Sequence, residues 1–241
     1  EQDLLVTSGA GSRVILVFSN GATINIGEDS EVEIRQFVQD PFAGEFAFAE
    51  ATTEPTDSTS QTRIHLSRGE LIGNVKSLNE GSTFEVSTPA GAAGIRGTTF
   101  RVVFRPNGTG GAFFTVTTIE GNVLVTTIEG SLAIDPISVT DLEEVEILVE
   151  VNDETGEVTV LNSTSELTTT AASPETIAQV TEVVQEAAAE VALLVLRELM
   201  GAPPPVTGEG DGDGEEPAPP PEETTPLPQT QIPSNSPSAG E

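Results

Sequence analysis

Few side chains in this sequence could act as a catalytic base. The chain has 241 residues with one histidine and no cysteine. His65 alternates with Ile64 and Leu66, and a period of two places it on the opposite, exposed face of a strand. A hydrolytic triad needs a base held between a nucleophile and an orienting group, and nothing here indicates one. We therefore predict no catalytic residue and a protein that is not an enzyme.

The abundant carboxylates could bind cations, but their spacing does not match a known set of ligands. Residues 208–216 alternate Gly with Asp and Glu and offer oxygen ligands for weak Ca²⁺ binding. The stretch lacks the fixed spacing and the bidentate Glu of a calcium loop. The sequence also has no Gly-rich phosphate loop leading into a helix with Lys. We predict no metal site and no cofactor.

The charge of the chain is strongly negative. Asp and Glu number 39 against 9 Lys and Arg, for a formal net charge of −30, and Arg197 is the only basic residue after Arg105. This excess repels a phosphate backbone, so nucleic acid is excluded as a partner. The sequence starts at Glu1 rather than Met, and we expect an export signal to have been removed or the first strands to be missing.

Alternating apolar and polar side chains predict strands in two blocks. The first block has short strands at about residues 13–18, 23–26 and 31–38, separated by Gly-containing turns. The second block runs from Arg63 to Ile134. Between the blocks, residues 39–60 form either a surface excursion that folds back onto the domain or a plain disordered loop. The side chains expected to fold back are Phe42, Phe46 and Phe48.

The most distinctive segment lies between residues 81 and 125. Alternation around Phe84 and Phe100 indicates strands with one buried face. Three glycines between them can take positive φ without steric cost, and we interpret the stretch as a sharp corner. They are Gly91, Gly94 and Gly97.

This segment resembles the signature of the FecR domain family: Thr-Pro, small residues, an Arg-Gly-Thr-x-Phe-x-Val strand and a downstream Glu-Gly-x-Val turn. The matching positions are Thr88, Pro89, Gly94, Arg96, Gly97, Thr98, Phe100, Glu120 and Gly121. The resemblance covers roughly residues 1–130. It implies an all-β, solenoid-like domain on the outer side of the inner membrane, involved in sensing or protein contacts, and it implies no chemistry.

An internal repeat agrees with that implication. Val-Thr-Thr-Ile-Glu-Gly at residues 116–121 recurs at residues 125–130. Such repeats suit a coil of short strands that stack on one another, although an ordinary antiparallel sandwich would give the same alternation. We expect an all-β, solenoid-like stack of short strands and hairpins, followed by one long α-helix and a disordered tail.

The expected organisation has five parts. They are a FecR-like β domain over 1–140, a β-hairpin extension over 141–162, a linker over 163–172, an amphipathic helix over 173–201 and a disordered, acidic, Pro-rich tail over 202–241. Ser173 is the expected N-cap of the helix, with Pro174 at its first position and Gly201 at its end.

The predicted helix carries a narrow apolar seam. Its members are Ile177, Val180, Val184, Ala187, Val191 and Leu194, whereas Glu182, Glu186 and Glu190 face away. These charges exclude a membrane span. The seam docks either onto the chain's own β domain or onto a partner helix, self-association included.

Arg96 stands out within the glycine corner. A guanidinium between two buried strands must be solvated or paired with a carboxylate, and Glu85 and Glu120 are the plausible partners. We expect its role to be structural.

Three functions fit these observations. The first is an exported, periplasmic or secreted FecR-domain protein that binds an unidentified protein or acts as a sensor in the cell envelope. The second, implied by the resemblance, is the periplasmic sensor portion of an anti-sigma regulator of iron uptake. The third is an extracellular scaffold or carbohydrate-binding module, which the absence of Trp and Tyr weakens.

Overall fold

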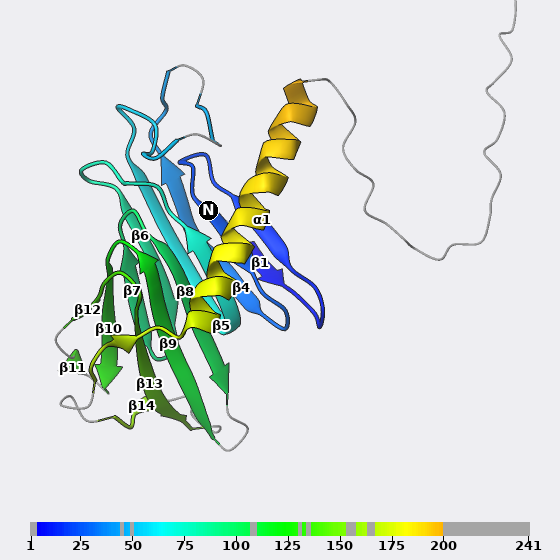
Figure 1. The fold of residues 1–241 in the computed structure, drawn as a ribbon. Helices are drawn as coiled ribbons and strands as arrows, with labels where there is room; N and C mark the ends of the chain where they lie inside the picture. Colours follow the sequence, from blue (N-terminus) through cyan, green and yellow to red (C-terminus); the bar gives the residue numbers. More distant parts are fainter. Residues whose placement is uncertain are drawn as a thin grey trace, which may run out of the picture. The chain divides into compact units, whose positions relative to one another are not determined.

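The computed structural model describes residues 4–43, 46–48, 51–106, 110–129, 132–133, 136–152, 158–162 and 167–199. These residues form fifteen strands and one helix (Figure 1). The strands are β1 Leu4–Thr7, β2 Val14–Val17, β3 Thr23–Ile26, β4 Glu31–Gln39, β5 Ser60–Asn74, β6 Thr83–Thr88, β7 Gly91–Ile95, β8 Thr99–Pro106, β9 Gly111–Glu120, β10 Val123–Glu129, β11 Leu132–Ala133, β12 Ile137–Val139, β13 Glu143–Val151, β14 Val158–Val160 and β15 Thr170–Ala171. The helix, α1, is Pro174–Leu199.

The strands form one sheet that curls like half of a barrel around β5. The first part of β5 pairs with β4 and β6, and its last part pairs with β3 and β8. We call the strands beside the first part the first half-sheet (β1, β4, β6, β7, β10, β11 and β12). Those beside the last part are the second half-sheet (β2, β3, β8, β9, β13, β14 and β15). All pairs are antiparallel except β5 with β6.

The bend in β5 has a local cause at Gly69. This residue has φ +103°, and a Cβ there would lie 2.1 Å from Ser30 Oγ. Ser30 Oγ accepts a hydrogen bond of 3.0 Å from the backbone N–H of Glu70. Glycine is required because only it takes this conformation without strain and leaves room for the serine. A kink of this kind is how a strand passes from one sheet layer into another.

The hydrophobic core lies between the two half-sheets. Phe84 of β6 and Phe100 of β8 face each other with ring centroids 6.4 Å apart, and both are buried. Ile24, Leu66 and Phe114 belong to the same buried cluster. Alternate residues of each strand therefore meet in the middle, as the period of two in the sequence predicted.

The prediction of a solenoid-like stack is wrong. In a solenoid the repeats at 116–121 and 125–130 would stack as neighbouring rungs. Instead β9 pairs with β8 and β13, whereas β10 pairs with β7 and β12 in the other half-sheet. The strands are also long, with 15 residues in β5, and they bury their apolar faces against the opposite half-sheet rather than the next rung. The mostly-β prediction with one helix near the C-terminus is confirmed.

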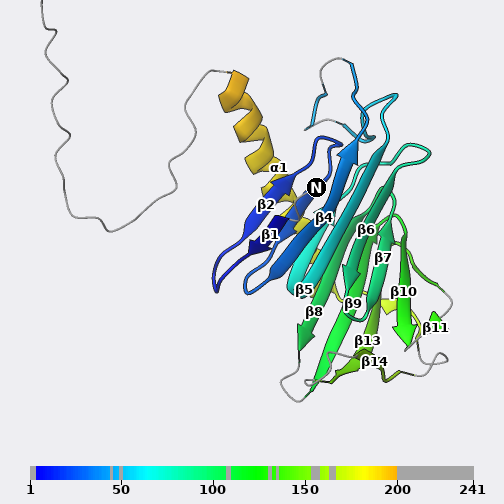
Figure 2. The ribbon, with the colours of Figure 1, turned by 180° about the vertical axis from the view of Figure 1, so that it is seen from behind.

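Helix α1 begins where its capping residues predicted. Ser173 Oγ accepts a hydrogen bond of 3.0 Å from the Thr176 N–H, as an N-cap does, and Pro174 is the first helical residue. The helix contacts β3, β5, β8 and β9, all at the second half-sheet. Figure 2, seen from behind, shows the strands in front of it. Within the described ranges, no helix has the length and apolarity needed to cross a membrane.

Several expectations fall on residues outside the described ranges. They concern the tail at 202–241 with its acidic stretch 208–216, the helix end at Gly201, residues 163–166 of the linker and the turn at 153–157. The strands flanking that turn, β13 and β14, pair as an antiparallel hairpin with Val149 opposite Val160. Because β13 also pairs with β9, this hairpin continues the second half-sheet.

Candidate functional site

The two parts of the family motif meet at one corner of the sheet. Thr99 pairs with Glu120 across β8 and β9. Gly121 has φ +97°, and a Cβ there would lie 2.6 Å from Thr98 Cγ2 and 2.7 Å from the Gly97 carbonyl oxygen. The downstream Glu-Gly therefore packs directly on the Arg-Gly-Thr segment, and Gly121 has no room for a side chain.

The interpretation of Gly91, Gly94 and Gly97 as one continuous corner needs correction. Residues Gly91–Ile95 are strand β7, and only Gly97 of the three has positive φ, at +70°. A Cβ at Gly91 would lie 2.2 Å from the Thr126 carbonyl oxygen. Gly91 therefore serves the close approach of β10 to β7, which the sequence pattern cannot distinguish from a turn.

The other motif residues shape the β6–β7 turn and the core. The Thr88 hydroxyl bonds the Gly91 carbonyl at 3.2 Å and the Ala90 N–H at 3.2 Å, with exposed Pro89 between them. Phe100 is fully buried. These contacts stabilise the turn and the core.

Arg96 is exposed to solvent. Among the described residues it forms no ion pair with Glu85 or Glu120. Of the two expected outcomes, solvation rather than pairing is observed.

The outer face of the second half-sheet is polar, and α1 covers it. Ile72 of β5 and Val103 of β8 are buried there, outside the main core cluster. The seam residues lie as follows: Val180, Ala187 and Val191 are buried, Ile177 and Val184 are half-buried, and Leu194 is exposed. The seam thus docks onto the chain's own sheet along most of its length, with Leu194 beyond the contact.

Two ion pairs connect α1 to the turn between β1 and β2. Arg13, in the turn between β1 and β2, reaches Glu186 at 2.5 Å and Glu190 at 2.7 Å. Both glutamates lie off the apolar seam and are exposed, as expected, but each also pairs with Arg13. All three side chains remain 42–50% exposed, so the pairs hold the helix in register more than they stabilise the fold.

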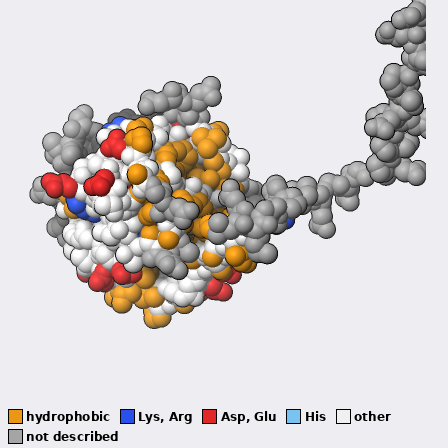
Figure 3. All heavy atoms as spheres, turned by 90° about the horizontal axis from the view of Figure 1, so that it is seen from above, with side chains coloured by type: hydrophobic (Ala, Val, Ile, Leu, Met, Phe, Trp, Pro, Cys, Tyr) orange, Lys and Arg blue, Asp and Glu red, His pale blue; other side chains and the backbone are white. Residues whose placement is uncertain are grey.

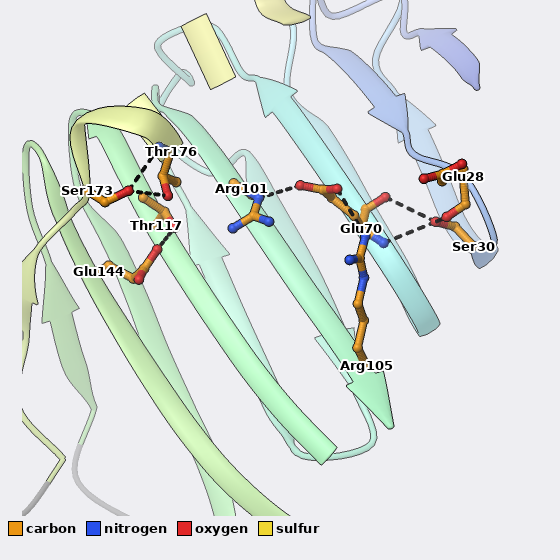
Figure 4. A network of polar contacts seen from close by, with 9 residues as sticks. All are labelled: Glu28, Ser30, Glu70, Arg101, Arg105, Thr117, Glu144, Ser173 and Thr176. Atoms are coloured by element: carbon orange, nitrogen blue, oxygen red, sulfur yellow. Dashed lines mark hydrogen bonds and ion pairs between the residues drawn. The ribbon is translucent and has the colours of Figure 1, made fainter. Parts of the chain in front are cut away.

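A more buried charge network lies on the same face and joins β5 to β8 (Figure 4). The Glu70 carboxylate bonds Arg101 and lies 3.3 Å from Arg105 Nη2. The side chains of Glu70 and Arg101 are only 11% and 17% exposed. Ser30 and Glu28 adjoin this network through the Ser30 hydroxyl, which donates to the Glu28 carbonyl at 3.1 Å. The carboxylate is satisfied by its own chain, so the network anchors β5 to β8.

A cavity of about 50 Å³ lies between α1 and the sheet. Its polar floor comes from β3 and from the end of β5, and its apolar roof comes from α1 and Phe48. The lining residues are Thr23, Asn25, Phe48, Ile72, Asn74, Lys76, Val184, Ala187, Ala188 and Val191. A neighbouring cavity of about 280 Å³ shares Asn74 and Lys76 and reaches Gly97, Thr98 and Glu120 of the motif corner.

Lys76 is the central cation of this region. Its side chain passes over Gly21, where an added Cβ would lie 3.0 Å from Lys76 Cγ and 2.9 Å from Phe46 Cζ. Burial lowers the pKa of the Lys76 ammonium. Phe46 in turn contacts Phe48 with ring centroids 4.8 Å apart. Phe42 packs against Phe46 with ring centroids 6.1 Å apart and is half-buried, so the three phenylalanines expected to fold back contact one another beside this lysine.

The last turns of α1 present an apolar surface. Leu193, Leu194, Val195 and Leu196 are all exposed, by 39–65%. Figure 3 views the molecule from the side toward which this end of the helix points, and it shows hydrophobic side chains gathered there. We call these four residues the apolar end of α1.

No group of three or more His, Asp or Glu side chains positioned to hold a metal occurs in the part of the chain that the structure describes. His65 lies half-buried on β5, with Nδ1 3.0 Å from Ser87 Oγ. Burial lowers its pKa, so this imidazole is neutral near pH 7.

Sequence reasoning missed Lys76 and Arg13. A signal for the first existed, because Lys76 is the single lysine among 241 residues. The Arg13 contact joins positions 173 residues apart, and no local pattern could have revealed it.

These features define a curled β domain with a C-terminal helix docked on its outer face. Residues 5–124 match the family model described as FecR protein. The chain belongs to the FecR family, as its motif predicted. No curated protein matches it in sequence.

Solved structures with some likeness to this chain include two of a putative anti-sigma factor from Parabacteroides distasonis ATCC 8503. Both are 17% identical to this chain, with TM-scores of 0.41 and 0.40. The matches cover 67% and 66% of this chain. The chain spans about three fifths of those proteins, 61% and 60% of their lengths.

Proposed function

We propose that this protein is an exported FecR-type sensor domain that binds another protein in the cell envelope through the apolar end of α1. Family membership supports the regulatory class. The contact surface is supported by one observation, the four consecutive exposed residues Leu193–Leu196.

Four consecutive helical residues point in all directions around the axis, at about 100° apart. Docking on the sheet can cover one face of a helix, so apolar side chains at this end remain exposed on the other sides. Contiguous exposed apolar surface marks a site of protein contact more often than an isolated exposed leucine does. A protein partner would remove this surface from water at about 25 cal/mol per Å².

The test compares two leucine pairs on the full chain. Leu193→Glu with Leu196→Glu adds two charges to the apolar end. Leu4→Glu with Leu5→Glu adds the same charges on β1, where the leucines are exposed to a similar degree, 56% and 59%. Circular dichroism of each variant checks that the fold is retained.

Each protein is cross-linked in envelope fractions of the source cells, and captured proteins are quantified by mass spectrometry. We expect wild type and the β1 variant to capture the same protein, and the α1 variant to lose it at least about tenfold, because a buried charge without a partner is strongly disfavoured in an interface. Equal capture by all three proteins, or no capture by wild type, would refute the proposed contact surface.

A further inference from the structure

Lys76 has no counter-charge among the described residues, in a chain that is rich in carboxylates. No Asp or Glu of the described ranges lies within ion-pair distance of it, although the chain has 39 of them. Its aliphatic stem is held against Gly21 and Phe46, and the side chain lines the cavity beneath α1. A half-buried ammonium without a partner bears a desolvation cost that an anion would offset.

Asn25 provides a second and independent sign of a missing ligand. This residue is 6% exposed, it lines the same cavity, and its Nδ2 has no hydrogen-bond partner. Most buried polar groups in native proteins are paired, so an orphaned amide beside a cavity calls for an explanation. Asn74, on the neighbouring strand, is oriented by its own bond of 2.9 Å to Thr99 Oγ1.

The roof of the cavity determines which chemical group can be attached to the charged head of a ligand. Val184, Ala188 and Val191 of α1 present only methyl groups to it. At about 50 Å³ the cavity exceeds the 10–15 Å³ that one water needs, yet it is too small for a ring system. It suits a charged head of two oxygens with a short aliphatic chain.

We propose that the cavity between α1 and strands β3 and β5 binds a short aliphatic carboxylate, with its oxygens at Lys76 and Asn25 and its chain beneath α1. This inference does not rest on the proposed protein contact, which uses the exposed residues Leu193–Leu196 in the last turns of the helix, none of which lines the cavity. The net charge of −30 opposes an anion at long range, but screening at physiological salt confines that repulsion to about 8 Å.

The single lysine makes the test direct. In full-length protein labelled with ¹³C,¹⁵N-lysine, the only side-chain ammonium signal comes from Lys76. Acetate, propionate and butyrate are titrated at constant ionic strength, and acetamide and butyramide serve as uncharged controls. We expect a saturable shift with each carboxylate, tighter from acetate to butyrate because of the apolar roof, and none with the amides.

A pair of α1 variants locates the site. Ala188 and Ala189 are both exposed, but only Ala188 lines the cavity. Ala188→Phe should weaken butyrate binding at least about tenfold by filling the space, whereas Ala189→Phe should leave it unchanged. In calorimetry, Lys76→Gln should abolish binding and Arg63→Gln, which removes an equal charge from an exposed site, should not.

The proposal fails if the Lys76 signal moves linearly without saturation. It fails equally if the amides shift that signal as the acids do, or if Ala188→Phe and Ala189→Phe bind butyrate alike. Loss of carboxylate binding would leave the cross-linking result at the apolar end of α1 untouched, so the two proposals are separately refutable.

Discussion

Arg13 Nη1 lies 2.5 Å from Glu186 Oε2, a contact that joins the turn between β1 and β2 to the middle of α1. The same guanidinium reaches Glu190 one helical turn further on. Because α1 otherwise holds the sheet through a few small apolar side chains, this clamp fixes where along the sheet the helix lies. The apolar end and the cavity roof are both positioned by it.

Replacing Arg13 tests the strength of the clamp. Arg13→Gln should lower the free energy of unfolding by about 0.5 kcal/mol, because exposed ion pairs contribute little. The loss should shrink at 1 M salt, where the Debye length falls to about 3 Å. Urea denaturation at low and high salt measures both effects. Arg35→Gln, which removes an exposed pair within β4, is the control for loss of charge, and a loss above 2 kcal/mol would show that the clamp does more than we infer.

The docking of the helix can be tested with two residues that both fit the 3–4 spacing of the predicted seam. Val180 is 0% exposed and Leu194 is 53% exposed. Val180→Ala should cost about 2 kcal/mol in unfolding free energy, because it removes buried methyl groups and leaves a cavity. Leu194→Ala should cost less than about 0.5 kcal/mol. Chemical denaturation of both variants decides the matter, and equal costs would mean that the seam extends as far as the sequence predicted.

The contrast between these two residues shows what the sequence can and cannot reveal about the helix. The 3–4 spacing of apolar residues and the Ser173-Pro174 start predict the helix and its buried face, because both depend on local geometry. Where the contact stops depends on the extent of the sheet below. Leu194 fits the pattern of the seam, yet no sheet lies beneath it.

The sheet shows the same division between local and long-range information. The short strands β2 and β3 follow directly from alternation and turn residues. The pairing partners of β9 and β10 do not follow from the sequence in this way. Their identical repeats predict neighbouring strands, whereas the bend in β5 puts the two strands in opposite half-sheets. That bend depends on the fit of Gly69 to Ser30 across 39 residues of sequence, which no periodicity encodes.

Gly69 therefore provides a strict test of the fold. Gly69→Ala should destabilise the protein by about 2–4 kcal/mol, because its φ of +103° disfavours any side chain and a Cβ would collide with Ser30. Gly94→Ala is the matched control, since a Cβ there meets nothing closer than 3.7 Å and should change stability by less than about 1 kcal/mol. Thermal unfolding of both variants tests the bend, and a neutral Gly69→Ala would contradict it.

The single histidine allows a prediction of how the stability of the fold changes with pH. Burial, together with the charge of Arg35, lowers the pKa of His65 in the folded protein, and Glu33 offsets part of that effect. The unfolded chain then takes up the proton first, at a pKa of about 6.5. The contribution of His65 to stability is therefore complete above pH 6.5, and it is lost as the pH falls through that value toward the folded pKa.

Two measurements test this predicted loss of stability at lower pH. The imidazole proton signal, unique in the spectrum, should titrate below 6.5 in the folded protein and near 6.5 in 8 M urea. The unfolding free energy of wild type should fall more steeply between pH 7.5 and 5.5 than that of His65→Gln, which keeps a polar group facing Ser87 but cannot titrate. A folded midpoint at or above the urea value, or parallel pH profiles for the two proteins, would mean that solvent reaches the ring and that the face of β5 beside β6 is more open than the structure shows.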